Sequence, residues 1–333
     1  MKNRFVRKVI SDYLCVAALI VILVVFAIST QGKLFQGDTV TAIVNQVVTT
    51  IIGGLGMIFV IAVGGTDITL GGQVVFSAGA AWMLTDALKL SGAAQLAVAF
   101  VICLIIGVLR GLFMGVVNTK FKVPSFMISL ALMLALRGGA NWMLGSKYFR
   151  ASKEVTMFDS WALKIPILLA LIAIMWYIME YTPFGYKCKA IGENENAIKY
   201  AGVNTDKIKI FVFIISGIMA SIVVFFMVAR NAGVTNTLAS GFEMRCMLAL
   251  FVAGVPVDGG TGTKMFKLIV GAFTVGVLES GLTLMNVPGS YVQLVKGIIM
   301  LALIILTVFL INSQAKRKAP AKAVAGAVKE EDK

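Results

Sequence analysis

The sequence predicts an all-α membrane protein that crosses the bilayer many times. Hydrophobic residues make up 59% of the 333-residue chain, charged residues make up only 14%, and the mean hydropathy is +0.92. These values are far from those of soluble globular domains. Lipid offers no hydrogen bonds to the backbone, so the apolar runs must form helices, and each crossing takes about 20 residues.

Apolar runs between charged residues, glycine and proline predict about ten membrane-spanning helices. The expected spans are 13–30, 40–63, 73–88, 95–117, 124–144, 164–181, 210–229, 243–257, 267–285 and 292–311. The third and eighth runs are short, so eight full spans with two broken or re-entrant segments is the alternative count. The chain is thus expected to have a cytoplasmic N-terminus at 1–12, a transmembrane domain at 13–311 and a basic, disordered cytoplasmic tail at 312–333.

The distribution of basic residues predicts the orientation. With the N-terminus inside, 19 of the 30 Lys and Arg residues fall in cytoplasmic segments, seven fall in outer loops and four fall within spans. Short cytoplasmic loops carry such an excess of Lys and Arg. Both termini are therefore expected in the cytoplasm. The attraction of the inner loops to anionic lipid accounts for the net charge of +14 without a nucleic acid partner.

Several kinds of chemistry lack their usual residues. The chain has no histidine, the commonest general base and metal ligand, and its four cysteines are scattered without a CxxC pair. The segment "GGTGTK" at 259–264 is too short for a Walker loop. We therefore expect no catalytic residues, no metal, no cofactor and no ATP hydrolysis by this chain. Intramembrane carboxylates are few, Glu279 being the clearest, which disfavours an ion-coupled carrier.

Glycine patterns predict close helix contacts and irregular backbone. In "GVLRGLFMG", Gly107, Gly111 and Gly115 form one smooth stripe on which a neighbouring helix can pack closely, as an ordinary bundle contact or as a junction in a transport domain. Two glycine-rich stretches at 63–73 and 253–263 each contain an aspartate. They are expected either to flank a translocation path or to form tight cytoplasmic turns.

Polar residues at helical spacing indicate where a path could run. Asn45 and Thr49 share one helix face, and Gln73 and Ser77 repeat that spacing. Hydroxyl and amide groups suit an uncharged, hydroxylated solute, and interhelical hydrogen bonds are the alternative role. The predicted substrate-path residues are Asn45, Thr49, Asp67, Thr69, Gln73 and Ser77.

One polar insert, residues 187–209, interrupts the apolar pattern on the cytoplasmic side. Asn194 is expected to cap a short helix that Gly202 ends, and Asn204 is expected to cap the next membrane span. A short amphipathic helix held between two spans is suited to transmit movement from a soluble partner into the bundle. A solvated connector is the alternative.

The residues around this insert resemble a known family. The stretch "FGYKCKAIGENENAIKYAGVNTDKIKIFVFIISGIMA" is similar to the cytoplasmic coupling loop, here 182–209, of permease subunits in ribose-type ABC importers. The segments "VGGTDITLGGQVVFSAGA", "FKVPSFMISLALMLALRGGA", "GFEMRCMLALFVAG" and "GLTLMNVPGSYVQLVKGIIML" resemble other segments of that family. The matches run in order from about residue 40 to 311.

The resemblance implies the membrane-spanning permease subunit of a bacterial ABC importer in the cytoplasmic membrane. Such a subunit pairs with a second permease subunit, identical or homologous, and with ATP-binding subunits that hydrolyse ATP. An extracytoplasmic binding protein delivers a monosaccharide, which crosses by alternating access. The residues to which the resemblance assigns contact with the ATPase are Gly192, Glu193, Asn194, Glu195, Ala197, Ile198, Ala201 and Gly202.

The sequence departs from the family pattern at several positions. Residues 66–69 read Thr-Asp-Ile-Thr where the family usually has Ile-Asp-Leu-Ser, residues 253–256 also differ, and Arg110 stands where asparagine is common. A particular sugar therefore does not follow from the resemblance. A permease for branched-chain amino acids, nucleosides or an autoinducer is the alternative within the superfamily, and a secondary carrier without an ATPase is the alternative from another class.

Overall fold

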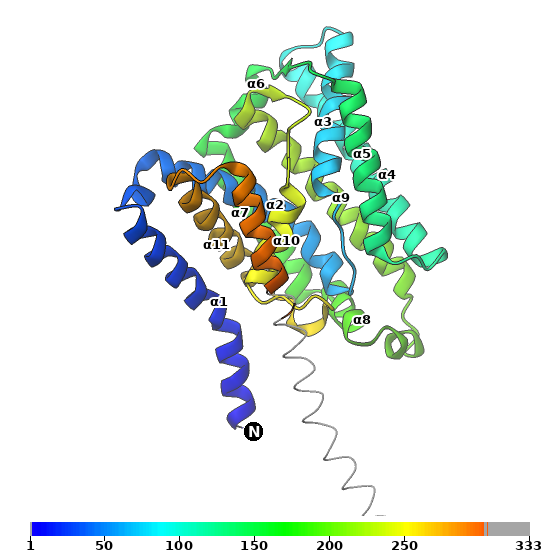
Figure 1. Ribbon diagram of the computed structural model, residues 1–333. Coiled ribbons are helices and arrows are strands. Elements are labelled where there is room, and N and C mark those ends of the chain that lie inside the picture. Colours follow the sequence, from blue (N-terminus) through cyan, green and yellow to red (C-terminus); the bar gives the residue numbers. More distant parts are fainter. Residues whose placement is uncertain (1, 303–304, 306–333) are drawn as a thin grey trace, which may run out of the picture. The chain divides into compact units, whose positions relative to one another are not determined.

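The computed structural model describes residues 2–302 and 305, which fold almost entirely as helices (Figure 1). The chain divides into two units, Met1–Val287 and Pro288–Lys333. The elements of the first unit are α1 (Lys2–Ser29), η1 (Lys33–Phe35), α2 (Gly37–Ala62), α3 (Leu70–Ala87), α4 (Gly92–Lys120), α5 (Ser125–Leu144), β1 (Phe149–Arg150), α6 (Lys153–Thr156), η2 (Met157–Asp159), α7 (Trp161–Tyr181), α8 (Pro183–Tyr200), α9 (Thr205–Asn231), β2 (Gly233–Val234), α10 (Phe242–Val252), η3 (Gly260–Gly262) and α11 (Met265–Leu284).

In the second unit the described part contains an apolar helix, Gly289–Ala302. The predicted tail at 312–333 lies outside the described residues. Strands β1 and β2 pair antiparallel, with Phe149 opposite Val234. The pairing joins the loop that follows α5 to the loop that follows α9.

The all-α prediction is confirmed, and part of the span count is supported. Within residues 2–302, six helices are long and apolar enough to cross a membrane, namely α2, α4, α5, α7, α9 and α11. The expected span at 243–257 is α10, an 11-residue helix. At about 1.5 Å per residue it is too short to cross about 30 Å of hydrocarbon alone. At this position the structure agrees with the alternative of a broken segment, because Gly241 and Gly254 bound the helix in left-handed backbone conformations.

Helices α2 and α9 form the centre of the first unit. Residues 47–62 of α2 are buried without a break, and α9 is buried along most of its length. Helix α2 packs against α9, α10 and α11, and α9 packs against α3 and α4 as well. A helix that is apolar on all sides and surrounded by others is expected to form the core of a large bundle.

The outer helices expose apolar side chains. On α4, Val101, Leu109 and Phe113 are each more than half exposed, and Leu134 of α5 is exposed to a similar extent. Large exposed apolar surfaces mark contact with lipid or with other proteins. These faces fit the hydrocarbon that surrounds a membrane-spanning bundle.

The glycine stripe of α4 lies against α9. A side-chain carbon at Gly107 would lie 2.5 Å from the carbonyl oxygen of Gly217, and one at Gly115 would lie 2.7 Å from the Cα of Ile210. At Gly111 it would meet the backbone of Phe213 and Ile214. Small residues therefore allow the two helix backbones to approach closely over at least two turns.

We predict that Gly111→Ala destabilises the bundle. The added methyl group would lie 2.5 Å from the carbonyl oxygen of Phe213 and 2.6 Å from the Cα of Ile214, which are backbone atoms that cannot rotate away. Overpacking of this kind costs about 1–3 kcal/mol. The thermal unfolding midpoint of the detergent-purified protein should fall.

The matched control is Gly138→Ala in α5, because an added methyl group there meets no atom within 4 Å. This variant should unfold at the wild-type temperature or slightly above it. Equal midpoints for Gly111→Ala and wild type would contradict the close α4–α9 contact.

Candidate functional site

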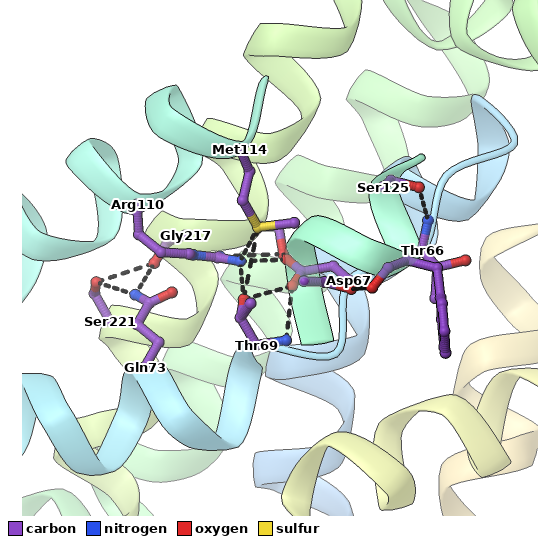
Figure 2. Close-up of polar contacts among 12 residues, drawn as sticks. Thr66, Asp67, Thr69, Gln73, Arg110, Met114, Ser125, Gly217 and Ser221 are labelled. Atoms are coloured by element: carbon purple, nitrogen blue, oxygen red, sulfur yellow. Dashed lines mark hydrogen bonds and ion pairs between the residues drawn. The ribbon is translucent and has the colours of Figure 1, made fainter. Parts of the chain in front are cut away.

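A buried ion pair lies where the chain unwinds between α2 and α3 (Figure 2). Asp67 is fully buried, and its Oδ2 lies 2.5 Å from Nη1 of Arg110, which projects from α4. The same oxygen accepts a hydrogen bond of 2.6 Å from the Ser216 hydroxyl of α9. The other carboxylate oxygen accepts from the backbone N–H and the hydroxyl of Thr69, at 3.0 and 2.5 Å. Both oxygens of this buried charge are therefore satisfied within the protein.

The unwound segment at 63–69 is held on several sides. The backbone N–H of Thr66 donates to the Ser125 hydroxyl at the start of α5, at 2.9 Å (Figure 2). The second glycine-rich stretch lies alongside, since a side-chain carbon at Gly64 would lie 3.3 Å from the carbonyl oxygen of Asp258. Irregular backbone at membrane depth requires such enclosure by protein. The first stretch is therefore fixed by contacts with α5 and with the second stretch, although Gly64 itself is exposed.

Gln73 and Ser77 are fully buried at the junction of α3, α4 and α9. Nε2 of Gln73 donates to the carbonyl oxygen of Gly217 at 2.8 Å and to the Ser221 hydroxyl at 3.2 Å (Figure 2). Gln73, together with Asp67 and Thr69, belongs to a polar cluster that links α3, α4 and α9, whereas the buried Ser77 hydroxyl has no hydrogen-bond partner among the described residues. Their role in a substrate path stays a prediction.

A separate polar pocket of about 280 Å³ lies where α9, the following loop and α10 meet α2. Its lining residues are Thr49, Met227, Arg230, Asn231, Thr235, Thr237, Leu238, Ala239, Ser240, Phe242 and Arg245. Thr49 is the one predicted path residue in this lining. Asn45, one turn earlier in α2, instead accepts a hydrogen bond from Nζ of Lys164, which also pairs with Asp159 at 2.6 Å. The predicted path residues thus separate into the buried cluster, the pocket and this lysine contact.

Two further ion pairs link the spans near the pocket. Arg137 of α5 lies 3.1 Å from Glu243 at the start of α10, and Arg245 of α10 lies 2.9 Å from Glu279 of α11. Neither these pairs nor the pair between Arg110 and Asp67 was expected from the sequence. A signal was present, because a charge within an apolar run needs an opposite charge inside the bundle. The sequence does not say which charges meet, since the partners lie 34 to 106 residues apart.

The polar insert forms two helical pieces rather than one. Helix α8 begins at Pro183 and bends at Asn194, whose backbone is extended, with φ −162° and ψ 96°. The side chain of Asn194 accepts from the backbone N–H of Ala197 at 3.0 Å, which confirms the predicted cap. Gly202 follows with φ +81°, and Asn204 accepts from the N–H of Lys207 at 3.0 Å as the cap of α9. The first piece was not expected, and Pro183 at its first turn favours helix there.

Three polar contacts brace the insert on the bundle. Lys189 lies 2.6 Å from Glu180 at the end of α7. Glu193 accepts from the Thr261 hydroxyl of η3 at 2.6 Å and from its backbone N–H at 2.9 Å. Gly192 leaves room for the chain to pass close to Ala62 and Gly260, where a side-chain carbon would clash with backbone.

Glu195 ties the short second piece to α9. Its carboxylate lies 2.9 Å from Nζ of Lys199 and 2.7 Å from Nζ of Lys209. Partial burial raises the pKa of Glu195, but hydrogen bonds from Lys209 and Lys199 outweigh that effect and lower it. Hydrogen bonds from the hydroxyl and the N–H of Thr261 likewise lower the pKa of Glu193. Because both pKa values are lowered, these contacts are fully present at neutral pH and weaken only as the pH falls through the lowered values.

The outer face of the short piece is left uncovered by the described residues. Ala197 and Ala201 are exposed, Ile198 is half-buried, and Tyr200 is 92% exposed. Small side chains beside an exposed aromatic ring make a surface on which a soluble partner can pack. The surface lies at the opposite end of α9 from the pocket, which is about 40 Å away for a 27-residue helix.

A bundle of long apolar helices, with ion pairs between its helices and a polar pocket at the end of α9, defines a multi-pass α-helical membrane transport protein. Comparison with known proteins identifies the family. The family described as "Branched-chain amino acid transport system / permease component" matches residues 39–304, and the chain belongs to it. This match agrees with the resemblance seen in the sequence from about residue 40 onward. The family and the apolar helices make the chain a multi-pass protein of the bacterial cytoplasmic membrane.

Curated relatives are import permeases. The chain is 29% identical to the ribose import permease protein RbsC of Haemophilus influenzae over 299 residues, which cover 86% of this chain and 90% of the relative. It is 28% identical to the ribose import permease protein RbsC of Escherichia coli K12, covering 85% and 90%. It is also 28% identical to the autoinducer 2 import system permease protein LsrC of Photorhabdus laumondii, covering 90% of each chain. No solved structure matches the chain.

We predict that Arg110→Gln strongly destabilises the protein. The change leaves the Asp67 carboxylate fully buried without its cation. Breaking a buried pair in this way costs about 3–5 kcal/mol. The thermal unfolding midpoint and the yield of folded protein in detergent should both fall.

The double variant Asp67→Asn with Arg110→Gln should recover part of the loss, because it removes both charges. A double variant that is no more stable than Arg110→Gln alone would show that the two side chains act separately.

Proposed function

We propose that the chain is the membrane-spanning subunit of an ABC importer, in which it passes a monosaccharide across the membrane by alternating access. Partner subunits hydrolyse the ATP, an extracytoplasmic binding protein delivers the solute, and a second permease subunit completes the path. The chain itself carries out no covalent reaction in this scheme.

The main support for the proposal is the set of contacts that hold the polar insert against the bundle. Its contacts through Glu180, Thr261 and Lys209 reach α7, η3 and α9, so a push on the insert acts on three parts of the bundle at once. Its exposed small face supports contact with a soluble ATPase. A carrier that works without an ATPase needs neither the bracing nor that face.

The relatives favour a sugar and leave a second candidate. Two of the relatives above are named ribose import permeases, which supports a monosaccharide. The autoinducer 2 import permease is similar to nearly the same extent, which supports an autoinducer as the second candidate. The pocket near Thr49 is the proposed solute site in either case, because it offers hydroxyl and amide groups at the C-terminal end of α9.

We propose ten membrane crossings, of which the eighth is the broken segment that contains α10, with both termini in the cytoplasm, on the strength of the excess of basic residues in the expected inner segments. Reporter fusions after Lys318 and within 147–160 would report the side of each segment. We expect the first to be cytoplasmic and the second to be outside. Finding both on one side of the membrane would refute this topology.

We predict that Ala201→Glu uncouples transport from ATP hydrolysis without preventing membrane insertion. Ala201 is exposed on the short helical piece, outside the apolar spans. Burying an unpaired carboxylate in a partner's groove costs about 1–3 kcal/mol, enough to weaken docking by up to about a hundredfold. The measurements are co-purification with the ATPase and solute-stimulated ATP hydrolysis in reconstituted vesicles.

Ala201→Ser is the matched control, because it adds a small polar group without charge. It should keep co-purification and stimulation close to wild type. Full coupling in Ala201→Glu would show that the insert is only a connector between two spans.

A further inference from the structure

We propose that the pocket beside Thr49 selects an anionic solute, a small hydroxylated carboxylate such as a sugar acid, over a neutral sugar. The inference rests on the proposed function, because it takes this pocket as the solute site. It goes further in naming the charge of the solute. It also departs from the uncharged solute that the polar helix faces indicated.

The charge of the lining is the first argument. Two arginines, Arg230 and Arg245, line the pocket, and no Asp or Glu is among its lining residues. Arg245 is committed to Glu279 through Nε at 3.0 Å and Nη2 at 2.9 Å. Arg230 forms no ion pair with any side chain that the structure describes within 4.0 Å. The pocket therefore carries a net positive charge.

Helix α10 adds to this positive potential. Its N-terminus lies at the pocket, since Leu238, Ser240 and Phe242 all belong to the lining. The first turn of an 11-residue helix presents partial positive charge to an anion. The acid in that turn, Glu243, is outside the lining and is paired with Arg137 of α5. It therefore does not cancel the helix end within the pocket.

The remaining lining groups fit the hydroxyls of such a solute. Ser240 and Thr237 are exposed at the pocket, and Thr49 and Thr235 add two further hydroxyls. Asn231 uses its amide nitrogen on the carbonyl oxygen of Met227 at 2.8 Å, which leaves its amide oxygen to accept from a solute hydroxyl. Hydroxyl and amide groups alone would suit a neutral sugar. The guanidinium group of Arg230 adds what a carboxylate requires, because its planar N–H donors can pair with both carboxylate oxygens.

Arg230 differs from the paired arginines of the bundle in having no ion pair with a described side chain. Arg110 and Arg137 lie within spans, and each has a carboxylate within 3.1 Å. Charges inside a membrane protein are normally paired in this way. Arg230 is instead exposed in the last turn of α9, where no described side chain forms an ion pair with it within 4.0 Å, although Asp159 interacts with it electrostatically. A solute anion would supply that partner during transport.

The test measures protection of a pocket cysteine in the purified permease without its ATPase. The four native cysteines are buried, so Ser240→Cys introduces one accessible thiol. Its labelling rate by a small neutral thiol reagent is measured with D-ribonate or D-gluconate, and with D-ribose or D-glucose as the neutral counterparts. We expect the two acids to slow labelling at concentrations at least tenfold lower than the two sugars.

Arg230→Gln in the Ser240→Cys background should raise the acid concentration for half-protection at least tenfold and leave the effect of the sugars unchanged. The matched control is Arg150→Gln, which removes an exposed arginine of β1 outside the pocket lining. It should leave protection by the acids at the level of the parent variant.

Equal protection by acids and sugars would overturn the proposal, and so would the absence of protection by all four compounds. Equal loss of protection in Arg150→Gln and Arg230→Gln would also overturn it, because general surface charge would then be responsible. The ATPase is absent from this assay. A failure here, with co-purification and stimulated ATP hydrolysis intact, would therefore refute the anionic solute and leave the importer function standing.

Discussion

The buried pair of Asp67 and Arg110 is the interaction on which the centre of this permease depends. Asp67 has no exposure, and a carboxylate inside a membrane protein is tolerated only with a cation and hydrogen-bond donors around it. Arg110 comes from α4, Ser216 from α9 and Thr69 from the start of α3. One carboxylate thus fixes the positions of three helices around an unwound segment.

The glycine stripe of α4 makes that arrangement possible. Arg110 lies between Gly107 and Gly111, and both glycines contact the backbone of α9. If side chains separated the two helices, Arg110 on α4 and Ser216 on α9 would lie too far apart to share the Asp67 carboxylate. Close packing and charge pairing therefore support each other. Either one alone would leave a buried charge or an unfilled gap.

Helix α9 runs from the polar insert to the proposed solute pocket. Near its start, Lys209 pairs with Glu195 of the polar insert, and at its end Arg230 and Asn231 line the pocket. Between them, Ser216 and Gly217 join the buried cluster. A rigid helix that touches all three places is suited to carry a displacement from the cytoplasmic insert to the solute site. The bracing of the insert on η3 and α7 supplies the stiffness that such transmission needs.

The sequence by itself determined the fold class, the family, the glycine stripe and the caps at Asn194 and Asn204. These follow from local signals, because apolar length, small-residue spacing and capping side chains act within one helix or one turn. It did not determine that Gln73 joins a buried cluster while Thr49 lines a pocket, although both are polar residues at helical spacing. Only the tertiary structure decided this, and it also decided which charges pair and that Arg230 lacks such a partner among the described side chains. The physical reason is that a side chain's partner depends on helices distant in the sequence, and no local pattern encodes their approach.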